Sequence, residues 1–337
     1  AATALRSTFA EVGDELGRFD VVVGNFEGVV DDAARGSTSP LIGTLCTGAE
    51  AARRMHDANI RVASLANNHT MDHGPEQYLG TAATLEEAGV AVVGHRERPW
   101  HVVDGGRTDV AVIAASYVPE TSADPLYWYR PTADDWAAML KALRAETPGC
   151  RVLAYLHWGN EFVRRPNPEQ LEICRRLIEL GVDAIVGCHS HTVQTAALID
   201  DVPVHFGLGN FVSDYWQDRL RDTVVAEIRF DGTATLVQTV RCRLDDRGCP
   251  RPVAAESVQL APFDGRTCSR RDVAAARLRA RIEYAAKLLR GFHRIRGKAI
   301  MARWALGRVG YVARYGIAEL RRPGLVYEKY SSPRPEG

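Results

Sequence analysis

The sequence predicts an α/β fold in which buried strands alternate with helices and a sheet is covered on both faces. The first observation is that short apolar runs recur through the first two thirds of the chain, and helix-like segments lie between them. The second is composition. The chain has 337 residues, of which 46% are hydrophobic and 25% are charged, which is typical of a globular protein with a large core.

The individual elements follow from apolar periodicity and from turn residues. Five runs are predicted to be buried strands: residues 19–25, 60–67, 109–116, 150–158 and 182–190. The segments between them include four predicted helices: residues 48–59, 74–89, 133–146 and 167–181. Beyond residue 192 the pattern changes to successive strands joined by tight turns, and Asp-Gly at 231–232 is a hairpin signal.

The seven cysteines are scattered, and no C-x-x-C pair occurs. This argues against a disulfide framework and a cysteine-based zinc module, and it favours a reducing compartment. No stretch reaches the 18 or more uncharged apolar residues of a membrane span, and the first residues have no signal-peptide core. We therefore expect a cytoplasmic protein, or a membrane-associated one if an N-terminal anchor has been removed.

Charge divides the chain unevenly although its net charge is zero. Residues 264–337 hold 18 Lys and Arg against 6 Asp and Glu, whereas residues 1–263 hold 24 against 36. We predict one domain over 1–263 and a basic helical C-terminal extension over 264–337. Apolar residues alternate with Arg and Lys there, which suits binding to an anionic membrane surface or an acidic partner. Packing of these helices on the acidic residues 1–263 is an equally good interpretation. No recognition motif accompanies the charge, so nucleic acid is not expected.

Two histidines follow the predicted strand at 182–190. His189 and His191 are two positions apart, and in an extended segment such residues project to the same side. Two neutral imidazoles converging on one point suit a metal ion, since histidine is the commonest metal ligand. A pair of solvent-facing loop histidines is the alternative.

Polar residues also follow three other predicted strands. They are Asn25 and Glu27 after the first strand, Asn67, Asn68 and His69 after the second, and His157 near the end of the fourth. In an open α/β sheet, ligands bind at the carboxyl ends of the strands. Four strand ends with such groups predict a divalent metal site, and mixed nitrogen and oxygen ligands suit Mn, Fe or Zn better than Mg or Ca.

Five motifs carry a resemblance to a known family: "NFEGVV", "SLANNHTMDHG", "LHWGNEF", "GCHSHTVQ" and "FGLGNFVSD". In order and spacing they resemble the CapA family of poly-γ-glutamate capsule synthesis, within the calcineurin-like metallophosphoesterase superfamily. The resemblance covers about residues 19–215. It implies a metallophosphatase-like sandwich of two mixed sheets flanked by helices, with a dinuclear metal centre at the strand ends. The C-terminal helical extension lies outside the matched region.

The resemblance also implies roles for individual residues. Glu27 would be the bridging carboxylate; Asn68, His157 and His189 would bind one metal, and His191 the other. His69 would be a catalytic histidine outside the ligand set, with Asp72 orienting it. Weaker candidates for substrate binding are Asn25, Asn67, Glu161 and Asn210. Glu161 is equally compatible with a surface loop, and Asn210 with a turn cap.

One family feature is missing from these residues. Members open with a strand ending in Gly-Asp, whose aspartate binds the first metal, and Asp14 in "FAEVGDELGRFD" is a poor substitute because that segment is polar. One or two metal ions are therefore expected, nearer one if that strand is truly absent. The predicted function is a metal-dependent hydrolase of an anionic or peptide-like substrate, associated with polymer biosynthesis. The alternative is a non-catalytic accessory component of a polymer synthesis or export complex.

Overall fold

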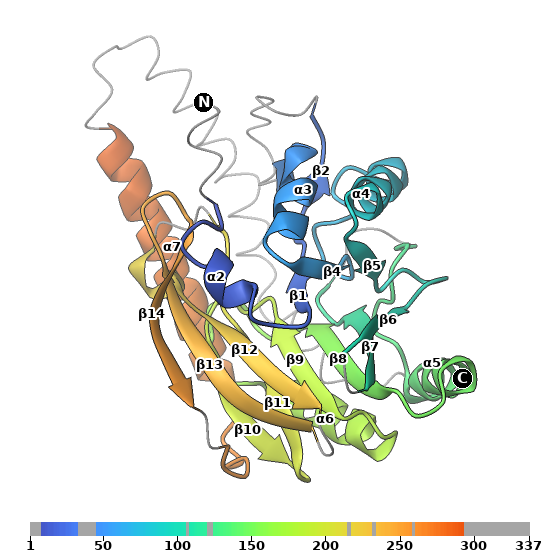
Figure 1. The fold of residues 1–337 in the computed structure, drawn as a ribbon. Helices are drawn as coiled ribbons and strands as arrows, with labels where there is room; N and C mark the ends of the chain where they lie inside the picture. The colour runs from blue at the N-terminus through green and yellow to red at the C-terminus, as the bar shows by residue number, and fades with distance from the viewer. Residues whose placement is uncertain are drawn as a thin grey trace. The chain divides into compact units, whose positions relative to one another are not determined.

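The computed structural model describes residues 8–32, 45–105, 108–119, 124–213, 217–230, 234–257 and 260–292 (Figure 1). Contacts group residues 1–36 and 44–268 into one compact unit, and residues 37–43 and 269–337 into another. The predicted domain boundary between residues 263 and 264 stays a prediction.

The larger sheet of the first unit has six strands in the order β10-β11-β9-β8-β7-β6. They are β6 (Trp100–Asp104), β7 (Asp109–Ser116), β8 (Arg151–His157), β9 (Ala184–Cys188), β10 (Ala196–Ile199) and β11 (Val202–His205). The four central strands are parallel, and each edge strand is antiparallel to its neighbour. Because parallel strands end at the same edge, the carboxyl ends of β8 and β9 lie side by side.

Two smaller sheets face this one. The first is parallel, in the order β1-β4-β5: β1 (Val22–Asn25), β4 (Ile60–Ser64) and β5 (Ala91–Val93). The second is an antiparallel meander of β12 (Asp222–Phe230), β13 (Ala234–Leu244) and β14 (Pro250–Ser257). Both contribute side chains to the core on one face of the large sheet, where Val62, Val112 and Val240 belong to the same buried cluster. A short pair, β2 (Val29–Val30) and β3 (Cys46–Thr47), follows β1 in the chain.

Helices cover the outer faces. Helices α5 (Ala133–Glu146) and α6 (Pro168–Glu179) pack on the far side of the large sheet, where Ile113, Leu140 and Leu177 form a second core. Helices α3 (Glu50–Asp57) and α4 (Pro75–Glu87) contact β4 and β5. Strand β7 is apolar from Val110 to Ala115 because alternate residues enter the two cores. The predicted α/β sandwich flanked by helices is confirmed, with the second layer divided into two three-stranded sheets.

The sequence analysis did not predict the strands β2, β3, β5, β6 and β14 or the 3-10 turn η1 (Asp218–Leu220). The polar segment around Asp14 contains the short helix α2 (Gly13–Leu16). The predicted hairpin is present as the antiparallel pair of β12 and β13, although its turn at 231–233 lies outside the described residues. All seven cysteines are free thiols.

The basic extension begins with helix α7 (Arg270–Phe292). Ser269 and Asp272 form a reciprocal capping box at its start. Leu278 and Ile282, one turn apart, are each 59% exposed. Residues 293–337 of the predicted extension lie outside the described residues, and its binding to a membrane or an acidic partner stays a prediction. Within the described ranges, no helix has both the length and the apolar character needed to cross a membrane.

Candidate metal centre

Four strand ends bring the candidate ligands together. His157 is the last residue of β8 and lies opposite Cys188, the last residue of β9, so His157 and His189 stand at the same level of the sheet. Strand β1 pairs with β4 so that Asn25 lies opposite Ser64. The segments that carry Glu27 and Asn68 leave these two strands at the same edge, as expected for parallel strands.

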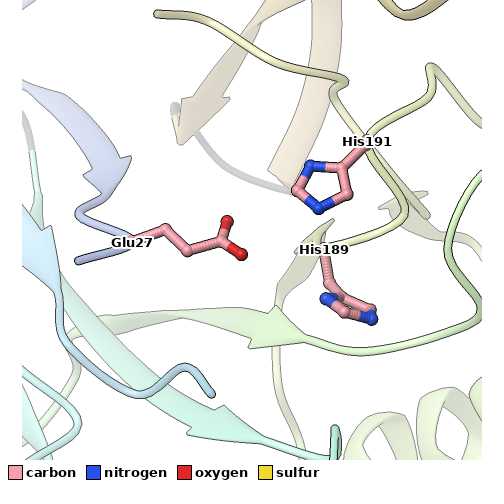
Figure 2. Close-up of side chains that lie close together, drawn as sticks. All are labelled: Glu27, His189 and His191. Atoms are coloured by element: carbon pink, nitrogen blue, oxygen red, sulfur yellow. The ribbon is translucent and has the colours of Figure 1, made fainter. Parts of the chain in front are cut away.

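The side chains converge on one small volume. One ligand atom each from Glu27, His189 and His191 lies within 4.8 Å of the others, and Figure 2 shows the carboxylate pointing across to the two imidazoles. His157 Nε2 is 2.8 Å from Asn68 Oδ1 and 3.8 Å from Glu27 Oε1. The rings of His157 and His189 have their centroids 4.8 Å apart. The structure thus brings together all five side chains that the sequence nominated as ligands.

The route by which His189 and His191 converge differs from the prediction. We expected an extended segment, but β9 ends at Cys188 and the two histidines have φ values of 88° and 54°. Residues other than glycine rarely adopt this left-handed region, and each instance costs on the order of 1–3 kcal/mol. The extended interpretation is therefore wrong for this pair. Strained backbone of this kind clusters at functional sites.

Hydrogen bonds behind two of the histidines fix which ring nitrogen faces the cluster. Asn210 Oδ1 is 2.8 Å from His191 Nδ1, and Cys188 Sγ is 3.3 Å from His157 Nδ1. In the tautomers that donate from Nδ1, the Nε2 lone pairs remain for a ligand, an arrangement typical of metal-binding histidines. Asn210 also donates to the Leu220 carbonyl, so it connects the histidine loop, residues 189–191, to η1. Asn210 thus positions His191, and its predicted contact with substrate stays a prediction.

Asn25 and Asn67 also lie behind the cluster. Asn25 Nδ2 donates to Glu27 Oε2 over 3.2 Å, and Asn67 Nδ2 donates to Asn25 Oδ1 and to the Phe26 carbonyl. Asn67 is fully buried. The two amides therefore orient the Glu27 carboxylate, and the predicted contact of Asn25 and Asn67 with substrate stays a prediction.

Burial sets the charge states of the cluster. It raises the pKa of Glu27, although the neighbouring His191 and His69 charges pull that pKa down. Burial also holds the pKa of His157 and of His189 well below the ordinary range, with smaller contributions from neighbouring histidines. Neutral imidazole is the form that binds metal, and a nearby cation favours the ionised form of a buried carboxylate.

The donor set passes a test of fit for a divalent cation. Glu27 Oε1 and His189 Nδ1 are both buried and have no hydrogen-bond partner in the described part of the chain, although buried polar atoms normally have one. Two ligands about 2.1 Å from one ion stand at most about 4.2 Å apart. The 2.8 and 3.8 Å separations around His157 meet this limit. The 4.8 Å spread of the Glu27, His189 and His191 group also suits ligands of two neighbouring ions.

His69 and Asp72 form a separate pair beside the cluster. His69 Nδ1 is 2.8 Å from Asp72 Oδ2, and the imidazole is 27% exposed. Burial alone lowers the pKa of His69, but the hydrogen bond to Asp72 and the charge of Glu27 outweigh it, so the net pKa is raised. Glu161 is exposed, yet its charge raises the pKa of both Glu27 and His69. It therefore lies within electrostatic range of the site.

Comparison with known proteins identifies the family. Residues 2–215 match the model of the bacterial capsule synthesis protein PGA_cap. This chain belongs to the PGA_cap family. The capsule biosynthesis protein CapA of Bacillus anthracis is 26% identical over 262 residues, covering 73% of this chain and 63% of that protein. The PGA biosynthesis protein CapA of Bacillus subtilis is 26% identical over 64% of this chain and 59% of its own length.

Two further likenesses complete the comparison. A probable polyglutamine synthesis accessory protein of Mycobacterium tuberculosis is 29% identical over 48% of this chain and 50% of its own. A hypothetical protein of Thermus thermophilus, of known structure, has a TM-score of 0.43 and 15% identity over 75% of this chain and 92% of its own. The chain thus spans less than two thirds of the curated relatives it matches.

The structure of this PGA_cap member also reveals site neighbours that the sequence analysis missed. The buried Cys188, the last residue of β9, contacts His157. Phe162, inside the "LHWGNEF" motif, stacks on His191, and Arg219 lies over the ring of Phe162. Asp14, the poor substitute for the missing aspartate, is exposed on α2. It does not belong to the group of ligand side chains found among the described residues.

Proposed function

We propose that this chain is a metal-dependent hydrolase that acts on a phosphate ester or a related amide with anionic or peptide-like groups. One observation carries the proposal. Glu27 and His189 each keep a buried atom without a partner among the described residues, in a cluster whose remaining members are metal-ligand side chains. Buried polar atoms normally have a partner. His205 Nδ1 also lacks one, but Glu27 and His189 belong, with His191, to a group whose ligand atoms lie within 4.8 Å of one another.

The ligands divide into one complete set and one partial set. Glu27, Asn68, His157 and His189 would hold one ion, and His191 with Glu27 would face a second. A bound divalent ion supplies Lewis acidity and lowers the pKa of a coordinated water. Imidazole, amide and carboxylate ligands suit Mn, Fe or Zn. Glu27, His189 and His191 each have a ligand atom within 4.8 Å of the others, and we expect one or two ions per chain.

His69 is the proton donor in this proposal. Asp72 accepts from Nδ1–H, so the proton on Nε2 faces away from Asp72 and is available to the leaving oxygen of a substrate. The hydrogen bond to Asp72 and the charge of Glu27 raise the pKa of His69 against the effect of burial, which favours the protonated ring that a general acid requires. General-acid assistance of this kind contributes about 10²–10⁴-fold to a rate.

The family supplies the biological setting. Relatives are named for capsule and PGA biosynthesis, and we propose that this chain serves a polyglutamate or related peptide-like polymer pathway. A second proposal, a non-catalytic accessory role, draws on the name of the Mycobacterium tuberculosis relative. In that case the same fold would act as a scaffold in a synthesis or export complex.

Metal analysis followed by a hydrolysis assay separates the two proposals. The full chain is dialysed against Mn²⁺ and assayed with 4-nitrophenyl phosphate, phenyl phosphate and a γ-glutamyl anilide. An enzyme retains at least one ion per chain and hydrolyses at least one of these compounds, and His189→Ala loses both properties. Retention of metal without turnover of any compound supports the accessory role, and absence of metal contradicts the hydrolase.

A further inference from the structure

An aromatic ring and a guanidinium extend the metal centre on the side of His191. The ring of Phe162 stacks on the ring of His191, with centroids 5.8 Å apart and an interplanar angle of 29°. The guanidinium carbon of Arg219 lies 5.2 Å from the centre of the Phe162 ring. A positive group is thus linked, through one aromatic side chain, to a candidate metal ligand.

The backbone holds Phe162 in an unfavourable conformation. Its φ is 64°, and a bulky residue in the left-handed region is a clear outlier. The Phe162 N–H donates to the Ser190 carbonyl over 2.8 Å, between the two histidines of the site. Phe162 is only partly buried, so core packing does not account for the strain. Such strain at a ligand-facing position is retained when the geometry itself serves the site.

Arg219 is anchored to the same histidine loop from another direction. It lies in η1, and the carbonyl of Leu220, the next residue, accepts a hydrogen bond from Asn210 Nδ2 over 3.1 Å. Asn210 also hydrogen-bonds His191 Nδ1. The ring and the guanidinium are therefore both positioned relative to His191, although they come from segments more than fifty residues apart in the chain.

The chemistry of this pair suits an oxyanion. A guanidinium directs its N–H donors outward in its own plane, where carboxylate and phosphate oxygens are bound in pairs. Stacking on an aromatic ring also restricts the long arginine side chain, which lowers the entropy lost on binding. Both side chains are partly exposed, as a contact with a ligand requires.

We propose that Phe162 and Arg219 form a subsite for a second anionic group of the substrate, a carboxylate or an additional phosphate, next to the reacting group at the metal centre. This inference rests on the proposed hydrolase function and narrows its substrates to compounds with two separated anionic groups. Phe162 supplies the surface that orients Arg219, and Arg219 supplies the charge.

The test measures binding of phosphonates, which are not hydrolysed, to the Mn²⁺-loaded full chain by isothermal titration calorimetry. Phenylphosphonate is the reference ligand, the 3- and 4-carboxyphenylphosphonates add a carboxylate, and 1,4-phenylenebisphosphonate adds a second phosphonate. The wild-type chain is expected to bind at least one doubly anionic ligand about ten times more tightly than the reference. Comparison of the carboxyphenylphosphonates with the bisphosphonate shows whether the subsite prefers a carboxylate or a phosphate-like group.

Three variants assign the preference. Arg219→Gln is expected to reduce the ten-fold preference to about two-fold or less, and Phe162→Leu to reduce it in part while keeping an apolar side chain. Arg164→Gln is the matched control, since Arg164 is an exposed arginine near Phe162 in the chain that lies 3.9 Å from Asp222, and it should keep the full preference. Metal content by elemental analysis checks that each variant retains its site.

The outcomes separate this inference from the hydrolase proposal. If the wild-type chain binds all the phosphonates with equal affinity, the subsite is contradicted and the metal centre is not. A preference that Arg164→Gln removes as effectively as Arg219→Gln also overturns it. Failure of the Mn²⁺-loaded chain to bind any phosphonate contradicts both.

Discussion

Buried histidines lie at the ends of two neighbouring strands, His205 at the end of β11 and His189 just after β9, and their surroundings differ. His205 ends β11, beside β9, and its Nδ1 has no partner among the described residues. Burial alone lowers the pKa of His205 to about 4. For His189 at the end of β9, burial acts together with the charges of His191 and His69. Within the described part of the chain, a carboxylate and a further imidazole that could share a metal ion surround His189 but not His205.

The contrast shows that burial and a lowered pKa do not by themselves make a metal site. His205 satisfies both conditions without further candidate ligands from the described residues. At the metal centre, the strained backbone at His189 and His191 orients their imidazoles towards one point. Asn25 donates a hydrogen bond to Glu27, and Asn210 accepts one from His191. The convergence of several ligand side chains on one point distinguishes the metal centre from His205.

The largest effect is expected from His189→Ala. It removes a ligand from the complete set, so metal content and activity should both be lost on every substrate. His205→Leu, which removes a buried histidine outside the cluster, should retain its metal. Elemental analysis and ester hydrolysis of the two variants measure this difference, and equal metal loss in both would show that the cluster is not special.

His69→Ala is expected to separate chemistry from metal binding. The variant should keep its metal, because His69 lies beside the ligands rather than among them. Turnover of phenyl phosphate, whose leaving group needs a proton, should fall by about two to four orders of magnitude. Turnover of 4-nitrophenyl phosphate should fall much less. Loss of metal, or equal slowing of both esters, would assign His69 a different role.

His205 should affect stability and its pH dependence instead. Its folded pKa of about 4 lies below the ordinary value of about 6.5, so the unfolded chain binds the extra proton between these values. The stability is complete above pH 6.5 and is lost as the pH falls towards 4. Urea unfolding should show that His205→Leu loses about 2 kcal/mol less than the wild type between pH 7 and pH 5. Parallel losses would show that His205 is not buried in its neutral form.

Asn210→Ala should weaken metal binding without abolishing it. It removes the acceptor that orients His191, and loss of such a supporting hydrogen bond typically weakens metal binding by about 10–100-fold. Competition with a chelator measures the affinity. An affinity equal to that of the wild type would mean that His191 is not a ligand.

The sequence predicts the elements of the site better than its geometry. Apolar runs and strand–helix alternation identify β7, β8 and β9 because buried parallel strands are continuously apolar. Three-residue strands such as β5 carry too little pattern to be recognised. Residues at the ends of parallel strands meet at one edge, so Glu27, Asn68, His157 and His189 could be grouped without a structure.

The contacts around the ligands could not be predicted, since they depend on backbone conformation and on long-range packing. Nothing in the letters of "GCHSH" signals the left-handed conformation of His189 and His191. Asn67 follows a strand, as a substrate-binding residue often does, yet its amide is buried against Phe26. Arg219 lies near Phe162 because η1 is connected to His191 through the hydrogen bonds of Asn210, a long-range contact.

The most direct test of the central claim is anomalous diffraction at the manganese absorption edge, from crystals of the full chain grown with Mn²⁺. We predict a peak at the carboxyl ends of β1, β4, β8 and β9, at about 2.0–2.3 Å from ligand atoms of Glu27, Asn68, His157 and His189. A well-ordered cluster without an anomalous peak among those four side chains would contradict it.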